Sequence, residues 1–247
     1  MKADPSEQLR LLDLQALDTR LDQLEHRRHS MPELAEIAAL DKELAHLRNL
    51  LVAAETQLSD LERERARAET DVEQVRTRVR RDRDRMDSGR ITNSKELVEL
   101  SSELESLARR QSVLEDVELE VMERIEVSSA EHQRVSVDVA AVEEKRAAAA
   151  GRRDAVLAEV DGEAALTTSA REAVVRDIGP QLLALYDKVR ASSGGLGAAE
   201  LKARRCQGCR LELNTVDLST FRDAAPDEVL RCEECRRILV RTPESGL

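Results

Sequence analysis

Small apolar side chains recur in this chain at alternating steps of three and four residues over long stretches. The first stretch runs from Leu51 to Val79 and the second from Leu97 to Val142, with Asp87-Ser88-Gly89 between them. Sustained heptads of this kind place the apolar side chains on one stripe of a helix, which then packs against a second helix. The pattern therefore predicts two long helices that are joined at a turn and form an antiparallel coiled-coil hairpin.

The composition argues against a compact globular core. Of the 247 residues, 36% are charged, and the chain has no Trp, one Tyr (Tyr186) and one Phe (Phe221). A globular core of this size would use many aromatic side chains, so we expect a mainly α fold. The first residues lack the apolar run of a secretion signal, and no stretch is long enough to cross a membrane. We therefore expect a cytoplasmic protein with no membrane contact.

Turn and helix-breaking residues divide the chain into parts. If the chain folds back near residue 90, positions whose numbers add to about 180 face each other, so Leu51 should lie near Val127. Pro32 and Gly151 then fall at one level of the hairpin, where both arms are weakened. The expected parts are a hairpin over 1–191, with its tip near 86–94 and kinks near 30–32 and 151, a Ser- and Gly-rich linker over 192–199, and a small domain over 200–247.

The four cysteines of the chain occur as two pairs in the small C-terminal domain. They are Cys206, Cys209, Cys232 and Cys235, which gives the spacing C-x2-C, 22 residues, C-x2-C. Each pair can present two thiolates from one tight turn, and two such turns form the closed tetrahedral site that Zn²⁺ prefers. A disulfide framework is the alternative. The spacing predicts a zinc ribbon with one structural zinc, which leaves no open coordination position for catalysis.

Three elements of the sequence resemble the bacterial C4-type zinc ribbon proteins with an N-terminal coiled coil. They are the long hairpin, a tip glycine (Gly89) followed by Lys-Glu-Leu at 95–97, and the ribbon motifs C-x-G-C at 206–209 and C-x-x-C-x-R-I-L at 232–239. The resemblance implies a non-enzymatic adaptor that binds nucleic acid or protein. Similar proteins in flagellated bacteria include chaperone-like members that contact an alternative sigma factor and messenger RNA.

The chain departs from the pattern of that family at two positions. An aromatic residue often precedes the tip glycine in the family, where this chain has Met86 and Asp87. Glycine often follows the last cysteine, where this chain has Arg236. Any family role that depends on those side chains is therefore in question for this chain.

The expected hairpin tip is strongly cationic, although the net charge of the chain is −11. Eight cations stand against three carboxylates between residues 76 and 95, which gives this segment about +5 and the remaining residues about −16. A cationic tip on an acidic rod could hold phosphates, or it could be a solvated helix end with local ion pairs. The candidate residues are Arg76, Arg78, Arg80, Arg81, Arg83, Arg85, Arg90 and Lys95.

A second group of arginines lies beside the expected metal site. Arg204, Arg205, Arg210, Arg236 and Arg237 flank the cysteine pairs. They could bind nucleic acid, or they could offset the negative charge of four thiolates around one zinc ion.

No set of residues in the sequence predicts an enzyme, since there is neither a Gly-rich phosphate loop nor a nucleophile elbow. We therefore predict an adaptor that binds an as yet unidentified protein partner through the ribbon. The alternative is a protein that binds RNA or DNA through the tip and the ribbon arginines. A monomer is favoured over a homodimer, because the hairpin uses its own apolar seam and the remaining surface is charged.

Overall fold

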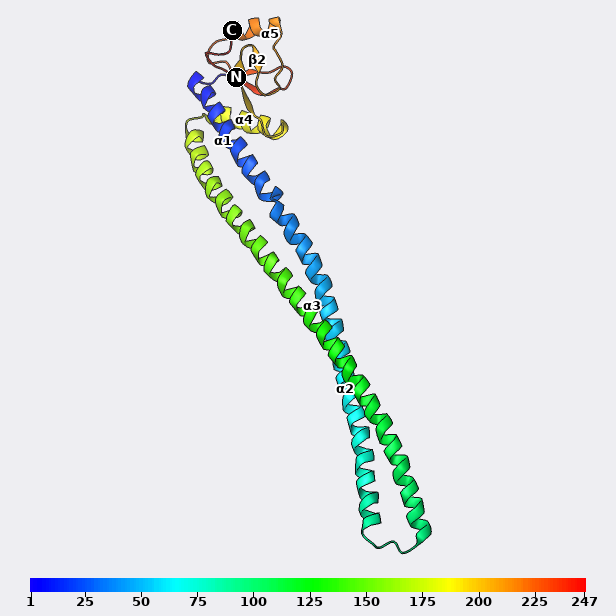
Figure 1. The fold of residues 1–247 in the computed structure, drawn as a ribbon. Coiled ribbons are helices and arrows are strands. Elements are labelled where there is room, and N and C mark those ends of the chain that lie inside the picture. Colours follow the sequence, from blue (N-terminus) through cyan, green and yellow to red (C-terminus); the bar gives the residue numbers. More distant parts are fainter. The chain divides into compact units, whose positions relative to one another are not determined.

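The computed structural model describes residues 1–247, which divide into two units (Figure 1). One unit contains residues 36–149, and the other contains residues 1–35 and 150–247. None of the helices combines the length and the apolar character needed to span a bilayer. The elements are α1 (Pro5–Ser30), α2 (Pro32–Asp87), α3 (Ser94–Arg176), α4 (Pro180–Ser192), β1 (Ala198–Lys202), β2 (Arg205–Cys206), α5 (Thr215–Asp223), β3 (Leu230–Arg231) and β4 (Ile238–Arg241).

The unit formed by residues 36–149 is an antiparallel pair of arms from α2 and α3, which confirms the expected helical hairpin. Its seam is lined by aliphatic side chains that are almost fully buried, among them Leu44, Leu61, Val72, Leu114, Val121, Val135 and Val142. Seven ion pairs also join the two arms: Arg48–Glu143, Arg146–Asp41, His132–Glu55, Arg124–Glu64, Arg76–Glu115, Arg78–Glu103 and Arg85–Glu96.

The register of this hairpin differs from the one expected for a fold centre at residue 90. For each pair between the arms, the two residue numbers add to a value between 181 and 191. These sums are centred near 186, whereas a fold centre at residue 90 requires about 180. The expected proximity of Leu51 and Val127 was therefore wrong by about one heptad, and Val127 is 73% exposed. A heptad repeat fixes the register only to within a multiple of seven residues, because every such shift realigns the same seam positions.

Pro32 and Gly151, the two positions expected to weaken the helices, behave differently. α1 ends at Ser30, Met31 adopts an extended backbone, and α2 begins at Pro32. The proline ring disfavours the helical region for the residue before it, so the break falls at Met31. α3, in contrast, continues without interruption through Gly151, because a glycine retains its backbone N–H and costs a helix only about 1 kcal/mol.

The other unit contains a four-stranded sheet with the strand order β2-β1-β4-β3. β1 pairs with β4 in parallel, while the pairs β1–β2 and β3–β4 are antiparallel. One face of the sheet shares a core with α1 and α4, in which Leu11, Leu14, Leu182, Tyr186 and Ile238 are buried. The other face packs with α5 through Leu201, Phe221, Leu230 and Leu239. The sheet thus lies between two cores, one shared with α1 and α4 and the other with α5.

The segment expected to be a flexible linker is tied to its neighbours. β1 begins at Ala198, inside the expected linker 192–199. Gly197 lies so close to Tyr186 that an added Cβ would come within 2.8 Å of the ring. Its N–H donates to Gln15 Oε1 at 2.7 Å. Glycine therefore serves close packing here as well as flexibility, and sequence composition does not distinguish the two uses.

Candidate metal centre

The four cysteines lie on two matching turns at strand ends. In the first turn, Arg210 N–H donates to Cys206 O at 2.7 Å, and in the second, Arg236 N–H donates to Cys232 O at 2.8 Å. Arg210 and Arg236 both have a positive φ, of 63° and 61°. Arg236 thus occupies the left-handed conformation that glycine would adopt, at a cost of roughly 1–2 kcal/mol. The departure from the family pattern at this position leaves the shape of the turn intact.

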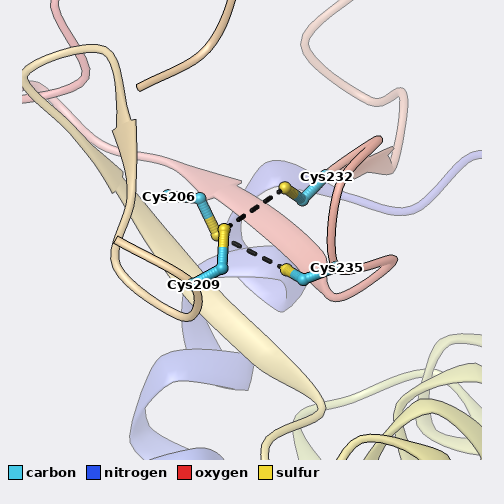
Figure 2. Close-up of side chains that lie close together, drawn as sticks. All are labelled: Cys206, Cys209, Cys232 and Cys235. Carbon is cyan, nitrogen blue, oxygen red and sulfur yellow. Dashed lines mark hydrogen bonds between the residues drawn. The ribbon is translucent and has the colours of Figure 1, made fainter. Parts of the chain in front are cut away.

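The sulfur atoms of the four cysteines converge on one point (Figure 2). The Sγ atoms of Cys206 and Cys235 are 3.8 Å apart, as are those of Cys209 and Cys232. All four lie within 4.8 Å of one another, and none forms a disulfide. A regular tetrahedron of sulfurs around Zn²⁺, with Zn–S bonds of about 2.3 Å, has edges of about 3.8 Å. The cysteines therefore fit one structural zinc, which confirms the sequence prediction and removes the disulfide alternative.

The protonation of the thiols depends on their surroundings. Burial raises the pKa of the Cys206 thiol, against the opposing hydrogen bonds from the backbone of Cys209 and Gly208. Burial likewise raises the pKa of Cys232. Burial also opposes ionisation of Cys235, but hydrogen bonds from the backbone and the guanidinium of Arg237 hold its pKa below the ordinary value. Zinc has to displace the remaining thiol protons, so its binding releases protons and weakens in acid.

The arginines near the cysteines have different surroundings. Arg205 and Arg236 are exposed and pair with Glu212 at 3.5 Å and Glu233 at 2.8 Å. Arg204 Nε donates to the carbonyl of Gly246, and Arg210 has no side-chain partner. Arg237 is partly buried and donates to two backbone carbonyls, of Leu196 and Ser193. Two of the five charges are thus paired with carboxylates, and two more residues donate to backbone carbonyls.

Ion pairs also engage most of the candidate residues at the hairpin tip. The pairs are Arg76–Glu115, Arg78–Glu103, Arg80–Glu73, Arg81–Asp82 and Arg85–Glu96. Arg83, Arg90 and Lys95 form no ion pair. These three residues lie near the end of α2, in the connection after it and in the first turn of α3, so the unpaired members of the candidate set are at the tip itself.

Sequence reasoning missed a buried polar cluster around Tyr186. The Tyr186 hydroxyl donates to Asp18 Oδ2 at 2.7 Å, and Arg171 Nε donates to Asp18 Oδ1 at 2.6 Å. Arg190 Nε lies 3.5 Å from Asp18 Oδ2, and its Nη2 donates to both carboxylate oxygens of Asp22. Burial, followed by the hydrogen bond to Asp18, raises the pKa of Tyr186 well above its ordinary value. The one available signal was that Tyr186 is the single tyrosine of the chain.

A helical hairpin that carries a four-cysteine zinc site defines the class of this protein. Comparison with protein families agrees with it. Residues 14–194 match the CT398-like coiled coil hairpin domain, and residues 205–239 match the C4-type zinc ribbon domain. The chain therefore belongs to the family of CT398-like coiled-coil hairpin proteins with a C4-type zinc ribbon. Neither of the two matching families is a family of enzymes, and the pair fits a non-enzymatic structural or binding role.

Individual relatives cover almost the whole chain. An uncharacterized protein of Mycobacterium tuberculosis is 37% identical over 98% of both chains. A solved structure from Mycobacterium smegmatis is 36% identical, has a TM-score of 0.85, and covers 98% of this chain and 100% of its own. The structure of CT398 from Chlamydia trachomatis is 16% identical with a TM-score of 0.68, over 96% and 98% of the two chains, and it supports the fold alone.

Proposed function

We propose that the protein is a non-enzymatic adaptor whose zinc ribbon binds a protein partner. The observation that carries this proposal is a pair of exposed apolar side chains in the segment after the first cysteine turn. Leu211 is 52% exposed and Val216, in the first turn of α5, is 70% exposed. Leu213, Leu218 and Phe221 from the same stretch are buried in the ribbon core. These two side chains are exposed beside a packed ribbon core, so they are available to be buried against a partner.

This proposal predicts that a double variant, Leu211→Ser with Val216→Ser, recovers at least about tenfold less partner than the wild type. The reason is that fully burying a Leu or Val side chain against a partner contributes about 1.5–3 kcal/mol. The measurement is crosslinking in cells followed by quantitative mass spectrometry. Leu166→Ser is the matched control, since Leu166 on α3 is 75% exposed but lies outside the ribbon. Equal recovery by the double variant would remove the ribbon surface from partner binding.

A second candidate function is binding of RNA or DNA at the hairpin tip. It is favoured by the three tip cations that lack a carboxylate partner, Arg83, Arg90 and Lys95. Unpaired cations release counterions from a nucleic-acid backbone when they contact phosphate, whereas paired arginines must first give up a carboxylate. The tip has no aromatic residue on which bases could stack, so this binding would be driven by charge and would be independent of sequence.

The charge-driven candidate predicts that changing Arg83, Arg90 and Lys95 to Gln abolishes most binding to nucleic acid. The slope of the logarithm of the binding constant against the logarithm of the salt concentration should become less steep by up to about 2–3. Each lost phosphate contact contributes about 0.7–0.9 to this slope. Fluorescence anisotropy with RNA and DNA probes at two salt concentrations measures this. The matched control changes Arg78, Arg80 and Arg85 to Gln, which removes the same charge from paired positions. If both triple variants bind nucleic acid equally well, binding depends on net charge alone, and the proposed site at the tip is wrong.

We place this adaptor in the cytoplasm and favour a monomer. A reducing compartment keeps the four thiols available for zinc, since an oxidising one would form disulfides between them. The monomer is favoured because the apolar seam of the hairpin is already covered by the partner arm of the same chain, and many of the remaining side chains on both arms are charged.

A further inference from the structure

Arg237 directly follows the second cysteine turn, and its side chain extends past Cys235 to the segment before β1. Its Nε donates to Leu196 O at 3.2 Å and its Nη2 donates to Ser193 O at 3.0 Å. Both acceptors belong to the segment 193–197 that connects α4 to β1. The backbone of Arg237 stays with the metal site, since its carbonyl accepts from Cys232 N–H at 2.9 Å. One residue thus joins the second cysteine turn to the connecting segment.

The first cysteine turn makes room for this side chain. A Cβ added at Gly208 would lie 2.7 Å from Arg237 Cδ and 3.1 Å from Ala199 Cβ. Both distances are shorter than ordinary van der Waals contacts, so no other residue fits at position 208 unless Arg237 moves. The path of the Arg237 side chain is therefore defined by both turns, which are separate in the sequence and meet at the four cysteines.

The opposite side of the connecting segment is held by α1. The Gln15 side chain is buried, and its Oε1 accepts from Gly197 N–H at 2.7 Å and from Ala198 N–H at 3.3 Å. Its Nε2 donates to Gly195 O at 2.9 Å. The segment 193–197 is thus held between Arg237 of the ribbon and Gln15 of α1, and each of the two supplies two or three hydrogen bonds.

We propose that Arg237 is a positioning residue that makes the docking of segment 193–197 onto α1 depend on zinc. Zinc holds the two cysteine turns at a fixed separation, and that separation leads the Arg237 side chain past Gly208 to the two carbonyls. Without the metal, the sheet still joins the strands beside the two turns, but the four cysteine side chains are no longer fixed to one another, and Arg237 loses its defined path. Ser193 O and Leu196 O then lose their donors, and the segment keeps only its hydrogen bonds to Gln15, the bond from Ile238 N–H to Gly197 O and its own bonds to the end of α4.

The test is hydrogen exchange of the full-length protein, followed at residues 193–198 by mass spectrometry. In the wild type, removal of zinc with a chelator should speed exchange of this segment at least about tenfold, the effect of losing one or two net hydrogen bonds. Zinc-loaded Arg237→Gln should show the same fast exchange while β4 stays protected. Its zinc affinity, from competition with a chromophoric chelator, should be roughly 10- to 100-fold weaker.

Three further variants separate this role from a general effect of charge. Arg236→Gln is the control, because Arg236 is exposed, pairs with Glu233, and should change neither exchange nor affinity. Gly208→Ala keeps Arg237 but blocks its path, and should reproduce the fast exchange. The proposal is overturned if zinc-loaded Arg237→Gln exchanges like the wild type at 193–198. It is equally overturned if Arg237→Lys matches the wild type, since a lysine would supply the charge but not the two-carbonyl bridge.

Discussion

Removal of zinc is expected to unfold the ribbon and to leave the hairpin of residues 36–149 helical. The ribbon contains one aromatic residue, and its strands β2 and β3 have two residues each, so its own core is small. Structural zinc supplies on the order of 10–16 kcal/mol in small zinc-binding domains, which is more than the ribbon core can replace. The hairpin is held by its own seam and by ion pairs between its arms, none of which contacts the metal site.

Far-UV circular dichroism before and after chelation measures this result. The helical signal should fall only slightly, because α5 has nine residues and α4 has 13, while α2 and α3 have 56 and 83. Hydrogen exchange should show loss of protection in β1 and β4, and added zinc should restore it. Cys232→Ser should behave like the chelated protein at any zinc concentration. A collapse of the whole helical signal would mean that the hairpin depends on the ribbon.

The sequence predicted the hairpin well because its seam is a local pattern. Heptad spacing reports which face of each helix is buried, and the Pro32 ring fixes where α1 ends. The register was wrong by one heptad because it depends on contacts between residues far apart in the chain. The same limit applies to the tip cations. Arg78 and Arg85 pair with glutamates of the opposite arm, and those partners follow only from the register.

The metal site was also predicted from a local pattern, namely two cysteine pairs with the spacing that one zinc requires. What the sequence could not show is how the ribbon joins the helices. Ala198 and Gln15 carry no recognisable motif, and both matter because α1 and β1 come together in three dimensions. Arg237 was one of five similar arginines in the sequence, and only the positions of Ser193 and Leu196 distinguish it from Arg236.

The buried cluster around Asp18 is the second place where one substitution should have a large effect. Asp18 is 3% exposed and is the common acceptor for the Tyr186 hydroxyl and Arg171, with Arg190 at 3.5 Å. It joins α1, α3 and α4 in one polar network. Removing one partner of such a network leaves the others buried without compensation, which costs more than the net value of the intact network.

Asp18→Ala is therefore expected to lower the free energy of unfolding of this unit by about 3 kcal/mol, the low end for a broken buried ion pair. The low end applies because the Arg171 and Arg190 side chains are 30% and 28% exposed, and water can partly solvate them. Tyr186 is the only Tyr in a chain without Trp, so its fluorescence in a urea titration reports this cluster directly. Asp13→Ala is the control, because Asp13 forms an exposed pair with Arg10 and should change the free energy by less than about 0.5 kcal/mol. A loss of similar size in both variants would show that the Asp18 network adds no more stability than a surface ion pair.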